Sequence, residues 1–276
     1  MENRETVFGG GEEDSSSGFA EVEALSVRGA DPGATETDAV PRETSLTLSI
    51  NGEELVTLLA TPRNLQALVI GFLFAEGFIK DPQELIALDI AAGKAEVELE
   101  DVDMTLKLFR RRVFGSGCGG PAGFTSALDA LAASGRDLPA CLPWVDAQTL
   151  REAARFTFSR GSLYRLTRGT HAAALFGREA EMVAMAEDIG RHNAVDKVIG
   201  LALLEDRPLE NLFMTVTGRI SSEMVGKLAH TQIPLVLSKS APTDLALDLA
   251  VKVSLSVVGR ATAKGFTVYT CPEMVG

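Results

Sequence analysis

One cysteine of this chain lies in a setting that suits covalent chemistry. Cys118 is the fourth residue of the segment GSGCGGP at 115–121, and three arginines at 110–112 precede that segment. The thiolate is the nucleophilic form of cysteine, and nearby cations lower the pKa of the thiol, so the arginines favour a reactive side chain. The four glycines leave the sulfur accessible, which argues against a buried structural role. We therefore interpret Cys118 as a nucleophile, and Cys141 and Cys271 as structural residues.

A second group of candidate residues follows strands in the latter half of the sequence. Three segments each join a predicted strand to a predicted helix: EDIGRHNAVDK at 187–197, TGRISSE at 217–223 and SKSAPTD at 238–244. Backbone N–H groups at a helix start favour anions, and arginine can bind a phosphate through two parallel hydrogen bonds. We expect these segments to meet at one edge of a sheet and to bind a phosphate-bearing, nucleotide-like ligand there. The residues in them that could contact it are Arg191, His192, Gly218, Arg219, Ser222, Lys239 and Thr243.

The first of these segments also contains a helix-start pattern. Asn193 suits the N-cap position, and Asp196, three residues later, suits the role of its partner in a capping box. Capping accounts for both residues but not for Arg191 and His192, which directly precede them. We therefore expect a guanidinium and an imidazole group to face the sheet edge.

Several kinds of site are disfavoured by the sequence. Neither GxxxxGK[ST] nor GxGxxG occurs, which argues against ordinary ATPase or dinucleotide-dehydrogenase chemistry. The three histidines, His171, His192 and His230, lack the i, i+4 spacing of metal ligands, and no Cys-x-x-Cys pair accompanies them. We predict no metal site. His171 starts an apolar strand, where a histidine is more often a hydrogen-bonded core residue than a catalyst.

The elements that must position these residues form an α/β pattern. Strands are predicted at 172–176, 182–186, 212–216, 234–237, 255–258 and 267–270, and helices at 193–204, 221–230 and 243–252. This alternation predicts a mixed, partly parallel sheet with helices on both faces. A smaller N-terminal α+β portion is predicted from a hairpin at 46–59 that turns at Asn51-Gly52, a helix at 62–76 that starts from Thr61-Pro62, extended residues at 96–109 and a helix at 124–133. A further helix is predicted at 146–157.

Charge and composition restrict the class of protein. The 276 residues carry a net charge of −12, which excludes a broad cationic binder of nucleic acid or of an anionic membrane surface. Residues 1–43 hold eleven acidic and three basic side chains and predict a disordered acidic tail. Residues 44–140 are predicted as an N-terminal portion with the hairpin, the helix and the Cys118 loop, and 141–276 as the α/β cofactor-binding portion, which could pack with it as one domain. Without an export signal or a long apolar run, the chain is predicted to be cytoplasmic.

These residues, in this order, resemble the formate dehydrogenase accessory sulfurtransferase family, FdhD. The resemblance covers about 44–276, and the string DIGRHNAVDK at 188–197 is its most specific part. The other matching residues are Asn51-Gly52, Pro62, Gly71-Phe72, Glu76-Gly77, Gly117-Cys118-Gly119, His171-Ala172-Ala173, Gly218-Arg219, Ala241-Pro242-Thr243 and Val268-Tyr269-Thr270.

The resemblance implies a cytoplasmic homodimer with a cytidine-deaminase-like domain that lacks the deaminase zinc. It also implies a function: sulfur is accepted as a persulfide from a cysteine desulfurase and passed to the molybdenum of the bis(molybdopterin guanine dinucleotide) cofactor, which formate dehydrogenase then receives. Cys118 corresponds to the persulfide-forming cysteine of the family. The stretch that corresponds to a cofactor-binding loop after the strand at 255–258 is Gly259, Arg260, Ala261, Thr262, Ala263 and Lys264.

Two departures from the family pattern leave alternatives open. Pro121 stands where the family usually has a second cysteine, which excludes a vicinal disulfide relay but still allows a persulfide on one thiol. Arg260 stands near the place of an arginine that the family carries in a Gly-Phe-x-Arg pattern, so this contact is either shifted or lost. A cofactor-binding chaperone without sulfur chemistry is the main alternative, and a nucleotide-metabolising enzyme that keeps only the fold is a third.

Overall fold

The latter half of the chain forms a six-stranded mixed sheet in this computed structural model, which describes residues 7–8, 18–27, 29, 33–100 and 144–276. The spatial order is β13-β12-β11-β10-β8-β9. Strands β10, β11 and β12 run parallel, whereas β8 is antiparallel to both of its neighbours and β13 is antiparallel to β12. The strands are β8 (His171–Phe176), β9 (Met182–Asp188), β10 (Phe213–Val216), β11 (Leu235–Ser238), β12 (Ser256–Thr262) and β13 (Gly265–Val268).

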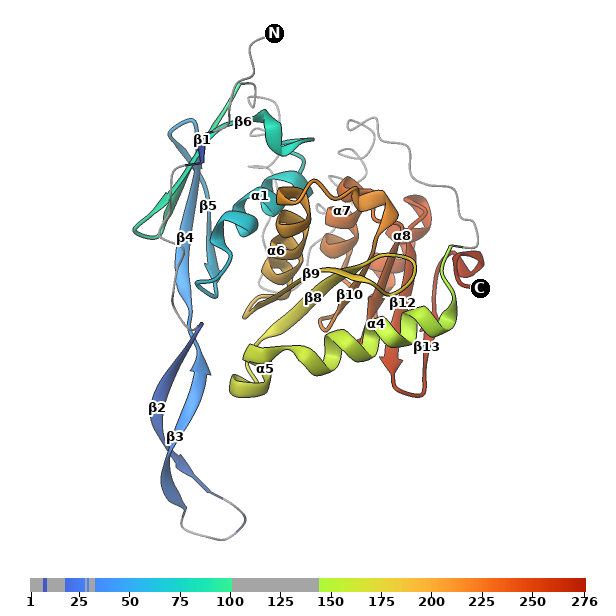
Figure 1. The fold of residues 1–276 in the computed structure, drawn as a ribbon, viewed down its shortest axis with the longest axis horizontal. Helices are drawn as coiled ribbons and strands as arrows, with labels where there is room; N and C mark the ends of the chain where they lie inside the picture. Colours follow the sequence, from blue (N-terminus) through green and yellow to red (C-terminus); the bar gives the residue numbers. More distant parts are fainter. Residues whose placement is uncertain (1–6, 9–17, 28, 30–32, 101–143) are drawn as a thin grey trace.

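Helices cover both faces of this sheet (Figure 1). Helices α6 (Arg191–Leu204), α7 (Ser222–Thr231) and α8 (Asp244–Lys252) share one buried cluster with residues of the sheet, such as Leu175 and Val236. Helix α4 (Ala147–Arg160) packs on the opposite face in a second cluster with Phe176 and Phe213 and leads into α5 (Ser162–Thr167). The predicted mixed α/β fold is confirmed, while its likeness to cytidine deaminases stays a prediction.

The N-terminal portion contributes a five-stranded sheet in the order β1-β6-β7-β4-β5. Its members are β1 (Val7–Phe8), β4 (Thr44–Ile50), β5 (Glu53–Ala60), β6 (Leu85–Ala91) and β7 (Lys94–Leu99). Strands β4 and β5 form the hairpin predicted from the turn residues Asn51-Gly52.

The described residues also form three short 3₁₀ helices, which are η1 (Pro82–Glu84), η2 (Leu209–Asn211) and η3 (Pro272–Met274).

Helix α1 (Leu65–Ala75) joins the two halves of the chain. It starts later than predicted, with Asn64 at the N-cap position in a left-handed conformation (φ 54°), so the expectation that Thr61-Pro62 starts the helix is wrong. The polar groups of Thr61 instead bind residues at the end of β9 and in α6. A tertiary contact therefore replaces the local cap.

Helices α1 and α6 cross at two glycines. A Cβ atom at Gly71 would lie 1.8 Å from the carbonyl oxygen of Asp196, and one at Gly200 would lie 1.9 Å from the carbonyl oxygen of Ala67. Both distances are far inside van der Waals contact with backbone atoms, so only glycine permits this approach at either position. The close crossing makes one continuous hydrophobic core of the two halves.

Strands β2 (Phe19–Ser26) and β3 (Ala34–Pro41) pair into a two-stranded antiparallel ribbon, the arm, which projects from the rest of the molecule (Figure 1). The expected disordered tail over 1–43 is therefore wrong for these residues. Their composition is acidic and poor in large apolar side chains because the strands lie in solvent rather than in a core. At its base, β3 packs on α5.

Four predictions lie outside the described residues: the loop with Cys118, the extended residues from 101 to 109, the helix at 124–133 and the structural role of Cys141. In the part of the chain that the structure describes, no helix is both long enough and apolar enough to cross a membrane.

Candidate functional site

The strand ends that carry the candidate residues meet at one edge of the six-stranded sheet. His171, the first residue of β8, pairs with Asp188, the last residue of β9. Val216 at the end of β10 pairs with Ser238 at the end of β11. The three strand-to-helix segments therefore share one edge, as predicted from the sequence.

Arg191 and His192 form the start of α6 at this edge, with Gly190 at the N-cap position. The side chain of Arg191 lies against Gly218. A Cβ atom added at Gly218 would lie 2.9 Å from the Cβ atom of Arg191. The second segment thus needs glycine at 218 to make room for the arginine of the first. The Nε atom of Arg191 is buried and has no hydrogen-bond partner among the described residues.

His192 is held in its neutral form. Burial lowers the pKa of its imidazole to about 3, and the cations of Lys227 and Arg191 act in the same direction. Its Nε2 lies 3.7 Å from a carboxylate oxygen of Glu223, beyond hydrogen-bond distance. At neutral pH this residue can therefore accept or donate a hydrogen bond, but it brings no positive charge to the edge.

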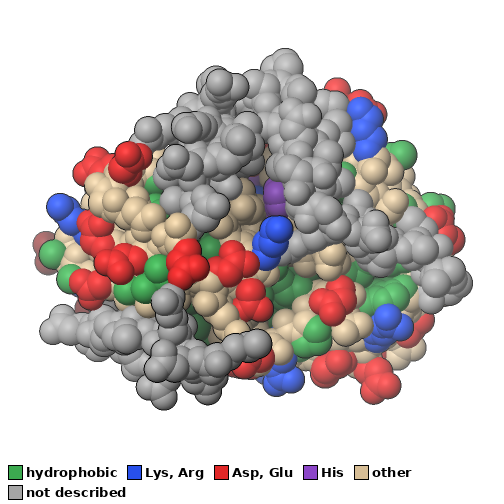
Figure 2. All heavy atoms as spheres, turned by 90° about the horizontal axis from the view of Figure 1, so that it is seen from above, with side chains coloured by type: hydrophobic (Ala, Val, Ile, Leu, Met, Phe, Trp, Pro, Cys, Tyr) green, Lys and Arg blue, Asp and Glu red, His purple; other side chains and the backbone are tan. Residues whose placement is uncertain are grey.

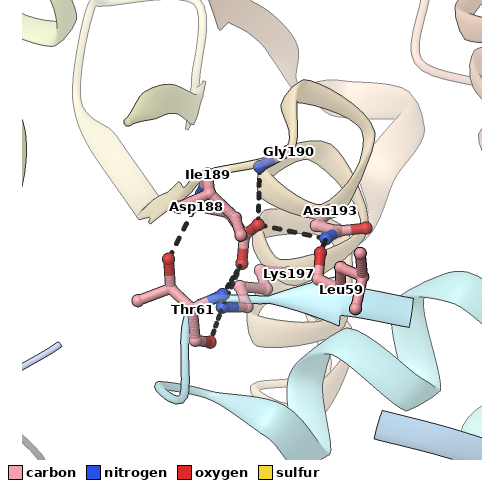
Figure 3. Close-up of polar contacts among 7 residues, drawn as sticks. All are labelled: Leu59, Thr61, Asp188, Ile189, Gly190, Asn193 and Lys197. Atoms are coloured by element: carbon pink, nitrogen blue, oxygen red, sulfur yellow. Dashed lines mark hydrogen bonds and ion pairs between the residues drawn. The ribbon is translucent and has the colours of Figure 1, made fainter. Parts of the chain in front are cut away.

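A buried network fixes the end of β9 to the connection between β5 and α1 (Figure 3). The Lys197 ammonium lies 2.6 Å from a carboxylate oxygen of Asp188 and donates a 2.8 Å hydrogen bond to the carbonyl oxygen of Thr61. Asp188 also accepts hydrogen bonds from the backbone N–H groups of Thr61 and Gly190, at 3.0 and 2.8 Å. Burial lowers the pKa of Lys197, and the charge of Asp188 opposes that shift.

Asn193 belongs to this network and does not cap the helix. Its amide donates to the carbonyl oxygen of Leu59 at 2.7 Å and to Asp188 at 3.0 Å. The predicted capping box is wrong for both residues. Asn193 binds Leu59 and Asp188, and Asp196 binds Lys227 of α7. Both side chains therefore form hydrogen bonds with residues of other elements rather than with the backbone at the start of α6.

Asp196 shares a buried cation with a second carboxylate. Lys227 lies 3.0 Å from both oxygens of Asp196 and 2.7 Å from an oxygen of Glu76. Burial raises the pKa of Asp196 to about 7, with the charge of Glu76 adding to the rise and Lys227 opposing it. The same two carboxylates raise the pKa of Lys227, which therefore stays protonated.

A cavity of about 580 Å³ opens between α4, α5 and the sheet edge. Its cationic side chains are Arg168 and Lys239, and among the described residues no Asp or Glu lines it. The Arg168 guanidinium lies 5.5 Å from the centre of the Tyr164 ring, and the Lys239 ammonium 6.0 Å from that of Phe158. The described residues that line it are Thr157, Phe158, Gly161, Tyr164, Arg168, Gly169, Thr170, His171, Ala172, Thr217, Lys239 and Ser240. Cations, hydroxyl groups and aromatic rings together suit an anion that carries a planar ring system.

His171 is one of the residues that line this cavity. Burial lowers the pKa of its imidazole, as does the nearby charge of Arg191, while Asp188 opposes the shift. Its Nδ1 lies 3.4 Å from the hydroxyl oxygen of Thr217, which also accepts a hydrogen bond from the N–H of Ala172. His171 is thus a partly buried, hydrogen-bonded residue, as its place in an apolar strand predicts, and it also lines the cavity.

Comparison with known proteins places the chain in a family. A family model described as the FdhD/NarQ family matches residues 41–275. The chain belongs to the FdhD/NarQ family.

Two relatives named sulfur carrier protein FdhD align with most of this FdhD/NarQ family chain. The Bacillus licheniformis protein is 36% identical over 242 residues, which cover 86% of this chain and 90% of that protein. The Bacillus subtilis protein is 36% identical over 250 residues, with the same two coverages. A crystal structure of a Desulfotalea psychrophila protein, assigned as a formate dehydrogenase accessory protein, has the same fold, with a TM-score of 0.71 and 23% identity over 94% of this chain and 99% of that one. The resemblance to FdhD is confirmed.

The segment that the FdhD resemblance marks as cofactor-binding is not a loop throughout. Gly259, Arg260, Ala261 and Thr262 are part of β12, and only Ala263 and Lys264 lie in the turn to β13. The expectation of a loop after Leu255–Val258 is therefore wrong for most of it. Arg260 takes a left-handed conformation (φ 53°) and donates its backbone N–H to Ser240, which lines the cavity.

The remaining predicted residues lie at helix starts of the same edge. Thr243 is the N-cap of α8, and its hydroxyl accepts from the N–H of Ala246 at 3.3 Å. Ser222 is the first residue of α7, whose N-cap is Ser221. Arg219 precedes them and is exposed.

Sequence patterns did not reveal the wall of the cavity. Thr157, Phe158, Tyr164 and Arg168 line it because α4 and α5 pack on the sheet near the strand ends, a placement that no local motif encodes. The signal that could have indicated this wall is the unusual density of arginine and aromatic residues between 151 and 168.

Proposed function

We propose that this chain is a cytoplasmic sulfurtransferase that carries persulfide sulfur on Cys118 from a cysteine desulfurase to the molybdenum cofactor used by formate dehydrogenase. The observation that carries the proposal is the match of most of the chain to relatives named sulfur carrier protein FdhD. Cys118, the proposed carrier, lies outside the described residues and is assigned through its sequence setting.

The cavity at the sheet edge supports a nucleotide-bearing substrate. Bis(molybdopterin guanine dinucleotide) carries phosphates and planar ring systems, and the cavity offers Arg168 and Lys239 beside the rings of Tyr164 and Phe158. Its volume of about 580 Å³ lies within the range of small-molecule sites. We propose that it takes one guanine nucleotide portion of this cargo, with Thr217 and Ser240 as hydroxyl partners.

The sulfur chemistry needs one nucleophile. The Cys118 thiolate attacks the outer sulfur of a persulfide on the desulfurase, a new S–S bond forms, and the desulfurase cysteine leaves as a thiolate. The outer sulfur then passes to the bound molybdenum cofactor and Cys118 returns as a thiolate. A thiol reductant supplies the two electrons that convert this sulfur into a sulfido ligand. Pro121 removes a second cysteine, so the carrier works with a single thiol.

Intact-mass spectrometry tests the proposal directly. We expect wild-type protein, incubated with a cysteine desulfurase and L-cysteine, to gain the mass of one sulfur atom and to lose it on addition of a reductant. Cys118→Ser should gain none, whereas Cys271→Ser, the matched control, should gain as much as wild type.

The other outcomes distinguish the proposed function from the alternative functions. No adduct on wild-type protein would contradict sulfur carriage and favour a cofactor-binding chaperone. An adduct that persists in Cys118→Ser would contradict the assignment of the carrier residue. Restoration of formate dehydrogenase activity in a deficient host, measured for both variants, links the adduct to function.

A further inference from the structure

The carboxylate of Glu187, near the end of β9, binds the start of α5. Its two oxygens accept hydrogen bonds from the backbone N–H groups of Tyr164 and Leu163, at 2.7 and 2.9 Å. They also accept from the hydroxyl groups of Ser162 and Thr170, at 3.4 and 3.3 Å. The first N–H groups of a helix have no partner within that helix, so a side chain of the sheet here takes the role of a cap.

This carboxylate lies directly behind the wall of the cavity at the sheet edge. Gly161, Tyr164 and Thr170 line the cavity, whereas Glu187 is not among the described residues that do so. A Cβ atom at Gly161 would lie 2.7 Å from Oε1 of Glu187, so the glycine leaves the space that the carboxylate occupies. Glu187 therefore contacts the wall without taking a place inside the cavity.

The contact with Tyr164 also determines where Arg168 lies, at the C-cap position of α5. The backbone N–H of Arg168 donates to the carbonyl oxygen of Tyr164 at 2.8 Å. The Arg168 guanidinium lies 5.5 Å from the centre of the Tyr164 ring. The aromatic ring and the cation on this side of the cavity therefore depend on the same support.

Helix α5 buries little of its own surface. Among its six residues, all of them described, Leu163 alone is buried, while Tyr164 is 37% and Leu166 55% exposed. A helix this short is not stable by itself. The end of β9 is firmly anchored, because the buried ion pair of Asp188 and Lys197 follows Glu187 directly. A fixed strand end thus supports a weakly packed helix.

Anion binding in this molecule depends on the accurate placement of a few cations. The net charge is −12, and acidic side chains are spread over the face seen in Figure 2. Arg168, at the end of α5, and Lys239, after β11, are the cations among the described residues that line the cavity. If α5 shifts, Arg168 no longer acts together with Lys239 on one ligand.

We propose that Glu187 is a positioning residue for nucleotide binding, which holds Tyr164 and Arg168 where the ring system and the phosphates of the ligand require them. This inference rests on the proposed function, because it takes the cavity as the site of a guanine nucleotide. By its charge alone, a carboxylate beside the cavity would weaken the binding of an anion. Positioning and charge therefore act in opposite directions, and substitutions can separate them.

Two substitutions of Glu187 make this separation. Glu187→Gln removes the charge and one acceptor oxygen, whereas Glu187→Asp keeps both oxygens and the charge but shortens the side chain by one methylene group. We expect each to raise the dissociation constant of guanosine diphosphate roughly tenfold in isothermal titration calorimetry, because Tyr164 and Arg168 lose their support. The matched control is Glu181→Gln, which should bind like wild type. Glu181 directly precedes β9 and accepts a 3.0 Å hydrogen bond from the backbone N–H of Glu179.

A double-mutant cycle tests whether the effect passes through α5. In the Arg168→Ala background no guanidinium is left to position, and we expect Glu187→Gln to raise the dissociation constant by less than about threefold further. In the Lys239→Ala background the same substitution should keep its effect of about tenfold, because Lys239 follows β11 rather than α5. The circular dichroism spectrum and the sulfur adduct of Glu187→Gln should match those of wild type.

Two results would overturn this proposal alone. The first is binding of guanosine diphosphate that is unchanged or tighter in Glu187→Gln and Glu187→Asp. The second is an equal loss in the Arg168→Ala and Lys239→Ala backgrounds, which indicates general damage to the fold. Wild-type protein that does not bind guanosine diphosphate would overturn both this inference and the nucleotide role of the cavity. Sulfur carriage is tested separately, since absence of the adduct from wild-type protein contradicts that function and leaves the binding measurements valid.

Discussion

The ammonium of Lys197 lies 2.6 Å from a carboxylate oxygen of Asp188, and neither side chain is exposed to solvent. This pair ties α6 to the end of β9, and both residues bind Thr61 in the connection that precedes α1. The contact therefore holds the N-terminal portion against the edge that carries the candidate site.

Removal of one partner of this pair should be costly. Lys197→Met leaves a buried carboxylate without its cation, and we expect a loss of about 3–5 kcal/mol in the free energy of unfolding, measured by urea denaturation. Arg207→Met is the control, because Arg207 and Glu205 form an exposed pair at 3.6 Å that should contribute less than about 1 kcal/mol. Equal losses in the two variants would contradict the structural role of the buried pair.

The glycine crossing of α1 and α6 should not tolerate a methyl group. Gly200→Ala places a Cβ atom 1.9 Å from the carbonyl oxygen of Ala67, so the helices must separate. We expect a loss of about 1–3 kcal/mol or more, seen as a lower midpoint in urea. Gly265→Ala is the control, since no described atom beyond Gly265 and its two chain neighbours lies within 4 Å of a Cβ at this position. If Gly200→Ala is as stable as Gly265→Ala, the crossing is not as close as described.

The raised pKa of Asp196 gives a definite pH dependence. In the folded protein the pKa is about 7, against 3.8 for an aspartate side chain in water, so between these two pH values the folded state holds a proton that the unfolded state has lost. The contribution of Asp196 to stability is therefore fully present below about pH 4 and is lost as pH rises through 7. The free energy of unfolding of wild type minus that of Asp196→Asn should fall over this range, and a difference that stays flat or rises in urea titrations at several pH values would exclude the shift.

Cavity cations should control affinity for a guanine nucleotide. If the cavity takes this part of the substrate, Lys239→Ala and Arg168→Ala should each raise the dissociation constant of guanosine diphosphate about tenfold in isothermal titration calorimetry, because each removes a charge-assisted contact. Arg178→Ala is the matched control, since Arg178 is an exposed arginine 4.5 Å from the centre of the Trp144 ring and does not line the cavity. Equal effects from all three variants would indicate a non-specific charge effect.

Local patterns in the sequence predicted the elements well where local forces decide them. The turn at Asn51-Gly52, the helix start at Asp146 and the alternation of strands and helices after 170 were all predictable, because turn residues, caps and apolar periodicity act over a few positions. The shared edge of the three segments followed from the same alternation.

The failures have a common physical cause in contacts between distant residues. Asn193 and Asp196 fit a capping box, yet both side chains bind partners on other elements. The arm lacks the apolar alternation of a half-buried strand, so its composition indicated disorder. The cavity wall on α4 and α5 depends on how these helices pack, which no short motif specifies.

The acidic residues at the end of β9 have partners within the molecule. Asp188 is matched by Lys197, and the carboxylate of Glu187 accepts hydrogen bonds from the backbone N–H groups at the start of α5, at 2.7 and 2.9 Å. Among the described residues that line the cavity, the charged side chains are the cations of Arg168 and Lys239, in a molecule whose net charge is −12. Such a local positive field steers anions during diffusion, and its reach shrinks as ionic strength rises. An anionic substrate should thus associate fastest in dilute salt.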